Sequence, residues 1–289
     1  MLVCNKYQAV STKLFQRVQL KSLCDQKPTK HWKLCIRNYV AKKILPSINP
    51  LMGVQSFTKE KLIREEDNIF MPTTKEVEQA EKIFIPRKFH EIKFVKGAYY
   101  PYQAPDYELP EIAFIGHSNV GKSSLIQSLF GKVVDLEVRT SGKPGHTKLL
   151  LFYQCGNYFS LVDMPGYGYN QPENFVTSAE GYISSRKNLQ LTFMLVDSNI
   201  GLRPEDFVAM EMFEEFAKPY AMIMTKADKA SKRDLVSSVT ATVKTIREKT
   251  QCCLPQPLLV SALTDLGLPF LQCFIAYTTG CLDVKGNVR

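Results

Sequence analysis

One stretch of the chain constrains its fold more than any other, and it reads Gly116-His117-Ser118-Asn119-Val120-Gly121-Lys122-Ser123-Ser124. It fits the pattern G-x-x-x-x-G-K-[ST], with an apolar run at residues 111–115 before it and an amphipathic run at residues 124–130 after it. These flanks are typical of a buried strand and a helix, whereas a chance match in a glycine-containing turn need not have both. In a strand–loop–helix unit, backbone N–H groups and the positive end of the helix dipole converge on one phosphate group. We therefore expect Lys122 to reach the terminal phosphates of a nucleoside triphosphate, and the Ser123 hydroxyl to bind Mg2+.

A second apolar run, residues 158–162, ends in Asp163-Met164-Pro165-Gly166. A strand that delivers a carboxylate at this point predicts that Asp163 holds the magnesium through a water molecule and that the Gly166 N–H bonds the γ-phosphate. That bond requires the γ-phosphate, so the loop would respond to the state of the nucleotide. Between the two motifs lies a polar loop that carries Gly145 and Thr147, and the Thr147 hydroxyl could complete the magnesium shell. The alternative for Thr147 is an ordinary loop threonine.

Two further segments predict which base is bound. Residues 220–224 lead into Thr225-Lys226-Ala227-Asp228, and residues 257–260 lead into Ser261-Ala262-Leu263. An aspartate accepts from both guanine N1–H and the guanine N2 amine, a pair of donors that adenine lacks, and the lysine stem can lie along the base. A backbone N–H of the second segment can meet guanine O6. Alone, either segment could be an ordinary helix start or loop, but together with the other motifs they favour GTP over ATP.

The order GHSNVGKSS, PGHT, DMPGYGY, TKAD and SAL resembles the translation-factor-related GTPases, and DMPGYGY with PGHTK is similar to their YihA/EngB branch. The resemblance runs from about residue 110 to about residue 277. It implies an α/β fold, a P-loop G domain with a mostly parallel six-stranded sheet and helices on both faces. It also implies GTP or GDP and Mg2+ as ligands, and a role in assembly of the large ribosomal subunit, with ribosomal RNA or proteins as partners and no DNA. The long amino-terminal extension makes the chain most similar to the mitochondrial animal members of the family.

Two positions depart from the pattern of many GTPases. Thr225 stands where many carry asparagine, which puts one loop-bracing hydrogen bond in question. Tyr167 follows Gly166 where Ras-like enzymes carry the glutamine that orients the attacking water, so the sequence assigns no catalytic base and predicts slow unassisted hydrolysis. In the wider family an asparagine at the place of Asn119 binds a potassium ion that bridges the phosphates. The alternative is that Asn119 only braces the loop by bonding backbone.

The net positive charge of the chain belongs to its amino-terminal segment. The 289 residues carry a formal charge of +9, and residues 1–49 hold ten Lys or Arg against one acid, so residues 50–289 are neutral overall. A basic, nearly acid-free leader without a long apolar core is a poor secretory signal and is typical of a mitochondrial transit peptide. The alternative is a basic tail that binds ribosomal RNA electrostatically.

These features divide the chain into four parts. Residues 1–46 are the expected transit peptide, which predicts a location in the mitochondrial matrix. Residues 47–109 form a connecting extension, with a threonine-capped helix at 73–84, an edge strand at 92–96 and an aromatic, proline-broken stretch at 99–105. Residues 110–280 form the EngB-type G domain, and residues 281–289 a short tail.

Several other features have ordinary interpretations. The tyrosines of residues 99–105 are expected to pack against the domain rather than to stack on RNA bases. His117 and His146 are expected to be surface loop histidines. The eight cysteines form no C-x-x-C pair, which indicates reduced thiols rather than a zinc site, and no run of about 18 apolar residues predicts a membrane span.

Three functions remain open at this point. The first is a GTP hydrolase that acts as a nucleotide switch on a large-subunit precursor. The second is a GTP-dependent docking module with negligible hydrolysis, favoured by Tyr167 in place of glutamine. The third is a P-loop ATPase or small-molecule kinase, against which Asp228 argues.

Overall fold

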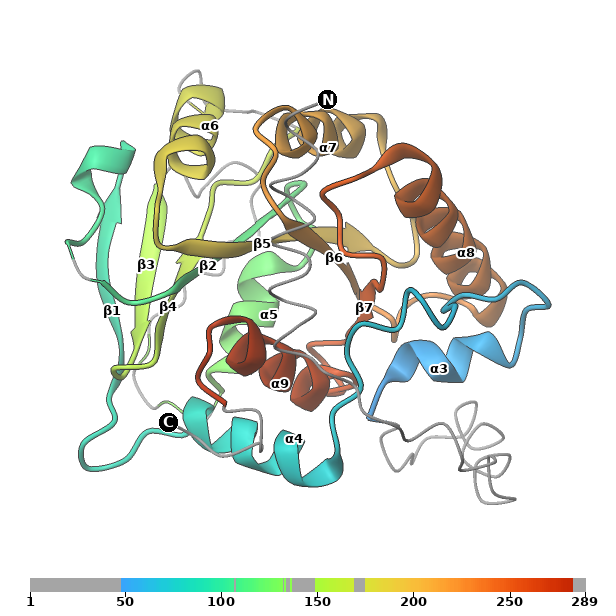
Figure 1. The fold of residues 1–289 in the computed structure, drawn as a ribbon, viewed down its shortest axis with the longest axis horizontal. Coiled ribbons are helices and arrows are strands. Elements are labelled where there is room, and N and C mark those ends of the chain that lie inside the picture. The colour runs from blue at the N-terminus through green and yellow to red at the C-terminus, as the bar shows by residue number, and fades with distance from the viewer. Residues whose placement is uncertain are drawn as a thin grey trace.

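The computed structural model describes residues 48–106, 108–131, 133, 136, 149–168 and 175–282. Within these residues, one twisted seven-stranded sheet runs through the molecule in the order β1-β3-β4-β2-β5-β6-β7 (Figure 1). The bounds of the strands are β1 Ile92–Ala98, β2 Glu111–Gly116, β3 Leu150–Cys155, β4 Phe159–Asp163, β5 Leu189–Asp197, β6 Tyr220–Thr225 and β7 Leu258–Leu259. Strands β4, β2, β5, β6 and β7 are parallel, whereas β3 is antiparallel to β4 and to β1.

The sheet has one strand more than the six expected. The additional strand is β1, which precedes the G-domain motifs and pairs with β3, from Ile92 opposite Cys155 to Ala98 opposite Leu150. Its alternating residues indicated an edge strand, and β1 is indeed at the edge of the sheet. The resemblance predicted only the strands of the G domain, so the sheet is one strand wider because the extension joins it.

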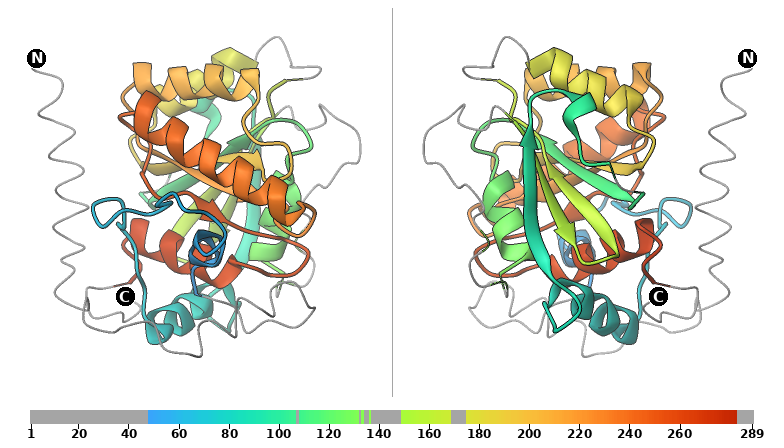
Figure 2. Two further views of the ribbon diagram at one scale, coloured as in Figure 1. Left: turned by 90° about the vertical axis from the view of Figure 1, so that its right-hand side faces the viewer. Right: turned by 90° about the vertical axis from the view of Figure 1, so that its left-hand side faces the viewer.

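Helices cover both faces of the sheet, as Figure 2 shows in the two side views. Their bounds are α3 Pro50–Gln55, α4 Thr74–Glu81, α5 Lys122–Leu129, α6 Phe175–Ser185, α7 Pro204–Glu215, α8 Lys232–Lys249 and α9 Leu268–Thr278, with short 3-10 turns η1 Lys82–Phe84 and η2 Pro101–Gln103. Successive side chains of β2 point to opposite faces of the sheet. Phe114 packs in a cluster with α4, α5 and α9, and Ile115 packs in a second cluster with α6 and α7. The central parallel strands are therefore buried on both sides.

The extension is part of the same hydrophobic core. Its helix α4 is preceded by Thr73, which forms a capping box with Glu76 and so satisfies the first backbone N–H groups of the helix. Phe70 is 4% exposed and lies edge-on to Phe270, Phe274 and Tyr277 of α9, with ring centroids 5.0 to 5.4 Å apart. Residues before the G domain thus complete the face of the sheet that α9 covers.

An arginine fixes the loop between α3 and α4. Arg247 of α8 donates from Nε and Nη2 to Asp67 at 3.0 and 2.7 Å, and the same guanidinium donates to the carbonyls of Lys61 and Leu62. Both side chains are mostly buried. Both bonds to Asp67 go to its Oδ2 atom, and such charge-assisted hydrogen bonds between mostly buried groups are stronger than an exposed ion pair, so they hold the loop against α8.

The tyrosines after β1 do not pack against the domain as expected. Tyr99, Tyr100 and Tyr102 are 54%, 36% and 80% exposed. The turn η2 instead docks through its smaller groups. Pro101 lies over Gly181 of α6, where a β-carbon would come within 3.2 Å of the proline ring, and the Tyr99 carbonyl accepts from Ser178 Oγ at 2.8 Å. This backbone docking turns the three rings toward solvent.

Some expectations fall outside the described residues. They are the transit peptide at residues 1–46, the loop residues Gly145, His146 and Thr147, and most of the tail at 281–289. Within the described residues, no helix is long and apolar enough to cross a membrane, the cysteines are free, and no cluster of three or more metal-binding side chains occurs.

If the extension belongs to the core, replacing Phe70 should destabilise the whole fold. We expect Phe70→Ala in the full chain to lower the free energy of unfolding by about 3–5 kcal/mol, because a buried ring is removed and a cavity left behind. Urea unfolding monitored by circular dichroism measures the effect. The matched control is Phe89→Ala, since Phe89 is 91% exposed, and it should change stability by no more than about 0.5 kcal/mol. Equal stability of the two variants would show that the extension does not stabilise the G domain.

Candidate nucleotide-binding site

The glycine-containing loop lies where strand β2 ends and helix α5 begins. Gly116 ends the strand, and a β-carbon there would come within 2.9 Å of the Leu195 carbonyl oxygen of β5, so the close approach requires glycine. Asn119 and Gly121 have positive φ angles of 65° and 102°, and Gly121 directly precedes α5 at Lys122. The loop therefore turns tightly onto the amino end of a helix, which is the arrangement that binds phosphate.

The end of strand β4 lies beside this loop. Phe114 of β2 pairs with Asp163 of β4 in parallel register, and the Asp163 side chain forms an ion pair with Lys122. Both are buried, with Lys122 7% and Asp163 0% exposed. Burial raises the pKa of Asp163, and the Lys122 ammonium only partly offsets this rise. Either charge alone would be costly at this depth, so the Lys122 ammonium and the Asp163 carboxylate stabilise each other.

The donor set fits a magnesium ion. Asp163 Oδ2 is buried and has no hydrogen-bond partner among the described residues. Ser123 is the second residue of α5, one position after the lysine that contacts the same carboxylate. Carboxylate and hydroxyl oxygens are the ligands that Mg2+ takes in nucleotide sites. Thr147, the third expected ligand, lies outside the described residues.

The loop after β6 is clamped onto the phosphate loop. Thr225 Oγ1 donates to the Val120 carbonyl at 2.7 Å and contacts the Val196 carbonyl at 3.2 Å. Lys226 has a left-handed φ of 54°, and its Nζ donates to the Asn119 carbonyl at 2.6 Å and to Asp197 Oδ2 at 2.8 Å. The hydrogen bond that braces the loop is therefore present. The Thr225 hydroxyl makes it, where many GTPases would use the side-chain amide of an asparagine.

The two segments expected to read the base also meet. Ser261 is buried and donates from Oγ to Asp228 Oδ1 at 2.6 Å, and the Thr264 N–H donates to the same Ser261 oxygen at 3.2 Å. Asp228 is itself exposed. The serine orients the carboxylate from one side, which leaves its other side open to a pair of N–H donors from a ligand.

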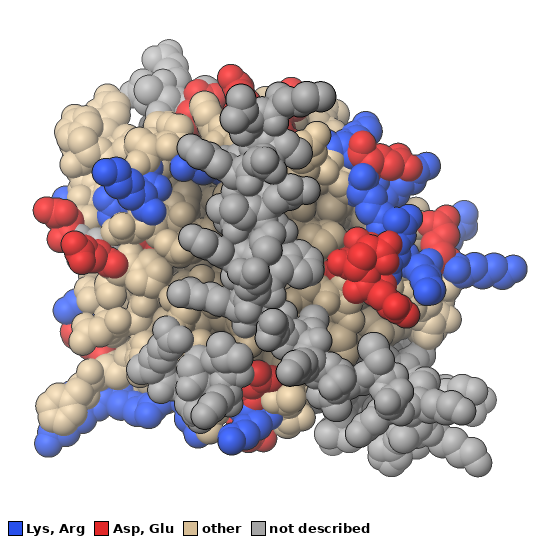
Figure 3. All heavy atoms as spheres, viewed as in Figure 1, with Lys and Arg blue, Asp and Glu red and all other residues tan. Residues whose placement is uncertain are grey.

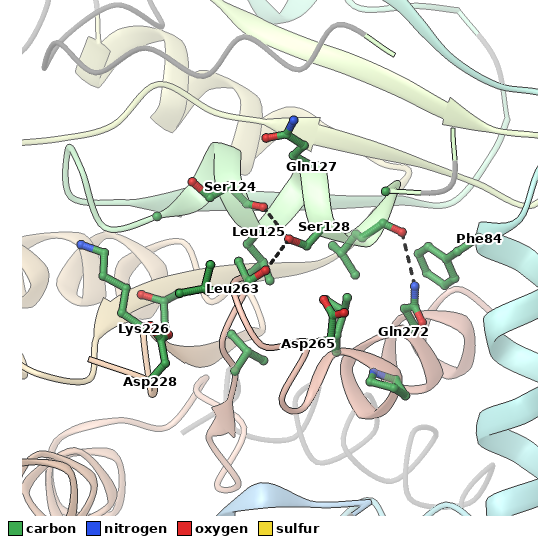
Figure 4. Close-up of a pocket in the computed structure, with 18 of the residues that line it drawn as sticks. Phe84, Ser124, Leu125, Gln127, Ser128, Lys226, Asp228, Leu263, Asp265 and Gln272 are labelled. Carbon is green, nitrogen blue, oxygen red and sulfur yellow. Dashed lines mark hydrogen bonds between the residues drawn. The ribbon is translucent and has the colours of Figure 1, made fainter. Parts of the chain in front are cut away.

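A cavity of about 740 Å³ opens beside these loops. Figure 4 shows Lys226 and Asp228 at one end, Ser124, Leu125 and Ser128 of α5 along one wall, and Phe84 of the extension at the far end. The cavity also takes in Gly121, Ala262 and Leu263 of the expected site. The structure thus brings the end of the phosphate loop, Asp228, which is expected to read the base, and the serine segment to one concave surface.

The residue after Gly166 is held in a buried network that the sequence did not indicate. Tyr167 Oη donates to Asp206 Oδ1 at 2.7 Å, and the Arg203 N–H donates to Asp206 Oδ2 at 2.7 Å. Burial raises the pKa of Tyr167 well above its usual range, and the neighbouring Asp206 raises it further, so the phenol stays protonated. Because Asp206 lies in the first turn of α7, the hydrogen bond connects the loop after β4 to that helix.

His117 belongs to the same network. Its ring nitrogens lie 2.9 and 3.2 Å from Arg203 Nη1, and its ring meets that of Tyr167 nearly at a right angle. The Ser118 N–H donates to the Tyr167 carbonyl at 2.9 Å. His117 is thus half-buried and not the surface histidine expected. The phosphate loop and the loop after β4 are joined by main chain and side chains alike.

Asn119 has an exposed side chain at its left-handed position, and this side chain makes no hydrogen bond to any described residue. The backbone-bracing role considered for it is therefore not supported within the described chain. Potassium binding by Asn119 stays a prediction.

Removing the Tyr167 hydroxyl should cost stability in a pH-dependent way. Burial raises the pKa of Asp206 and the hydrogen bond from Tyr167 lowers it, so Tyr167→Phe should raise that pKa further. A folded-state pKa above the unfolded value means stability is lost as pH rises through it. We therefore expect Tyr167→Phe to cost about 1–3 kcal/mol near neutral pH and less in acid, where Asp206 is protonated with or without the hydroxyl.

Urea unfolding at several pH values measures this difference. Tyr220→Phe is the matched control, because its hydroxyl makes a longer bond of 3.3 Å to Glu214, and it should cost less. A Tyr167→Phe penalty that does not change with pH would show that the hydroxyl does not act through the Asp206 carboxylate.

The chain is similar in sequence to known proteins. Residues 111–226 match the family model described as 50S ribosome-binding GTPase. The chain is 31% identical over 235 residues to a probable GTP-binding protein EngB of Caulobacter vibrioides, a match that covers 78% of this chain and 99% of the relative. It is 32% identical to the corresponding protein of Gluconobacter oxydans, with 75% and 94% of the two chains covered. The solved structure of a probable GTP-binding protein engB superposes with a TM-score of 0.44 at 22% identity, over 59% of this chain and 98% of that chain. With its phosphate loop, its buried Lys122–Asp163 pair and its relatives matched over nearly their full length, the chain belongs to the EngB family of GTP-binding proteins.

Proposed function

We propose that this chain is a GTP hydrolase that works as a nucleotide switch in assembly of the large ribosomal subunit of mitochondria. The main support for GTP as the ligand is the position of Asp228. Its Oδ1 accepts a hydrogen bond from Ser261 Oγ at 2.6 Å, and it lines the cavity that opens beside the phosphate loop. The ribosomal role is supported by the description of the matching family model. The mitochondrial compartment is supported by the basic, nearly acid-free residues 1–49.

The residues of the site divide the work of binding. The amides of the loop from Gly116 to Gly121 receive the phosphate oxygens, Lys122 places a positive charge against them, and Asp228 selects guanine. When bound, Mg2+ neutralises charge on the β- and γ-phosphate oxygens. The Lys226 stem lies beside Gly121, where a β-carbon would come within 3.5 Å of its Cε, so the base and phosphate sites are held at a fixed separation.

The described residues connect the loop after β4 to helix α7, and the residue after Gly166 is a tyrosine whose hydroxyl is already bonded. The Tyr167 hydroxyl is directed to Asp206 at 2.7 Å, so it holds the loop in place and does not present a free group to a water molecule. Gly166, the residue expected to sense the γ-phosphate, is directly joined to this anchored tyrosine. A change at Gly166 would be passed to α7 through the Tyr167–Asp206 bond, and hydrolysis would be slow until a partner adds the missing group.

The second candidate is a docking module that binds GTP and hardly hydrolyses it. The same anchored tyrosine favours it, since this chain carries Tyr167 where Ras-like enzymes carry the glutamine that orients the attacking water. Turnover measurements separate the two candidates.

Base selection is tested at Asp228. Asp228→Asn should weaken GTP binding by at least about tenfold, because an amide cannot accept from both guanine donors and a charged hydrogen bond is lost. The same variant should gain affinity for xanthosine triphosphate, whose 2-carbonyl needs a donor. Competition against a fluorescent GTP analogue measures both values, with Asp265→Asn, another exposed aspartate that lines the cavity, as the control. Unchanged GTP affinity in Asp228→Asn would contradict the proposal that Asp228 recognises guanine.

Turnover tests the switch. Purified full-length protein should hydrolyse GTP slowly, at roughly the unassisted rate of about 10⁻⁴ to 10⁻³ per second, and mitochondrial large ribosomal subunits should stimulate it. Turnover measured in potassium buffer and in sodium buffer tests Asn119. A requirement for potassium would support the prediction that Asn119 binds a potassium ion. Many turnovers per second by the protein alone would contradict the expected need for a partner. Tight binding without turnover under any condition would favour the docking module.

A further inference from the structure

Every exposed aromatic side chain among the described residues lies in one short segment. The five residues and their exposed fractions are Phe89 91%, Phe94 44%, Tyr99 54%, Tyr100 36% and Tyr102 80%. Elsewhere in the described chain, aromatic rings are buried or half-buried. Burying a ring of this size stabilises a fold, so a segment that exposes five of them has another use for their faces.

The same segment is basic. Residues 82–102 contain Lys82, Arg87, Lys88, Lys93 and Lys96 against the single acid Glu91, whereas residues 50–289 as a whole are neutral. All five basic side chains are exposed. The turn between η1 and β1 projects at the lower left of Figure 1, and Figure 3 shows basic side chains grouped at this corner.

The geometry of β1 spreads rings and charges along an open edge. Lys93 pairs with Gln154 and Lys96 with Phe152, whereas Phe94 pairs with Tyr153 on the opposite face, with a bulge between Phe94 and Lys96. Because β1 is the last strand of the sheet, the lysines and the phenylalanine flank an edge that no described strand covers.

Two of the rings form a ready-made stacking platform. Tyr100 and Tyr102 lie parallel, with centroids 5.5 Å apart and planes 7° from each other. Tyr102 also borders an open groove of about 650 Å³. Its lining includes Ser184 and Ser185 of α6, the basic residues Arg186 and Lys187, and the acids Asp106 and Glu108. A flat ring beside hydroxyl groups suits a planar heterocycle, which can stack on one and hydrogen-bond to the others.

We propose that residues 87–102, which we call the β1 surface, bind single-stranded segments of RNA, with bases stacked on the exposed rings and phosphates near the lysines. Aromatic faces interleaved with positive charge match a chain of bases on a polyanionic backbone. A protein strand paired with the β1 edge would use its backbone and would not need the rings at Phe89 and Tyr102. Double-stranded RNA hides its base faces and is therefore a poorer fit. The inference deepens the proposed function, on which it rests for the source of the RNA, the large ribosomal subunit.

Crosslinking locates the contact without altering the protein. The full chain is irradiated with a mixed-sequence single-stranded RNA that carries 4-thiouridine, and crosslinked peptides are identified by mass spectrometry. Crosslinks on peptides within residues 87–102 are expected. Crosslinks confined to the basic residues 1–46, or to any other part of the chain, would overturn the proposal.

Paired variants test the two components of the surface by fluorescence anisotropy with the same RNA. Phe89→Ser with Tyr102→Ser should weaken binding at least about fivefold for each ring lost. Lys93→Glu with Lys96→Glu should lower the slope of log affinity against log salt by about 1.4, the value for two phosphate contacts on a single strand. The leader is present in every protein compared, so its own contribution cancels.

The controls introduce the same residues, serine for an apolar side chain and glutamate for lysine, at other exposed positions. Ile200→Ser with Val208→Ser removes two side chains that are 53% and 66% exposed, and Lys75→Glu with Lys244→Glu reverses two exposed charges. Both should leave RNA affinity unchanged. Equal affinity of surface and control variants, or binding to ribosomal proteins but not to RNA, would overturn the proposal.

The outcome can be separated from that of the proposed function. The β1 surface variants should retain GTP affinity, because none of the four residues lines the nucleotide cavity. If large subunits fail to stimulate turnover but crosslinks fall in residues 87–102, the proposed function fails and the RNA surface stands. If subunits stimulate every β1 surface variant as well as the unaltered protein and no crosslink falls in the segment, the surface assignment fails alone.

Discussion

The buried contact between Lys122 and Asp163 is the interaction on which the site depends. It exists because β2 and β4 run parallel and side by side, so that the loop after one strand and the carboxylate at the end of the other reach the same point. An isolated charge at such a depth would cost several kcal/mol, so each residue makes the other tolerable. The loops for the base are then built outward from this centre, through Thr225 and Lys226, which bond directly to the phosphate loop.

The sequence predicted best those features that depend on neighbours along the chain. The strand, loop and helix around Lys122 follow from short-range patterns, and so do the capped helix at Thr73 and the edge character of β1. The sequence did not reveal contacts that depend on how helices lie on the sheet. Tyr167 and Asp206 are 39 positions apart, and Arg203 and His117 are 86 positions apart. No local pattern connects such pairs. Residues 203–206 have the proline and the first-turn acids that are typical of a helix start, and nothing in them points to Tyr167 or His117.

Thr225 and the tyrosines after β1 show why a residue type cannot be judged without the position of its backbone. Thr225 put in question a hydrogen bond that asparagine makes in many GTPases, but the main chain brings the Val120 carbonyl within 2.7 Å of the Thr225 hydroxyl, which makes the bond. The tyrosines after β1 were expected to pack inward, but Pro101 and the Tyr99 carbonyl make the contact with α6, and the rings are left outside. In both cases the position of the backbone decided which part of the side chain is used.

The packing of the extension also limits how far a protease can shorten this chain. Asn49 caps α3 by accepting from the Leu51 N–H at 3.0 Å, and Leu51 and Val54 are each 1% exposed in a cluster with α8. A cut after Asn49 would leave the amino end of α3 without its cap, and a cut after Val54 would open the cluster to water. Further along, Phe84 lines the far end of the nucleotide cavity. A protease that shortens the amino end and leaves this capping and packing intact must therefore cut before Asn49, whatever its own sequence specificity.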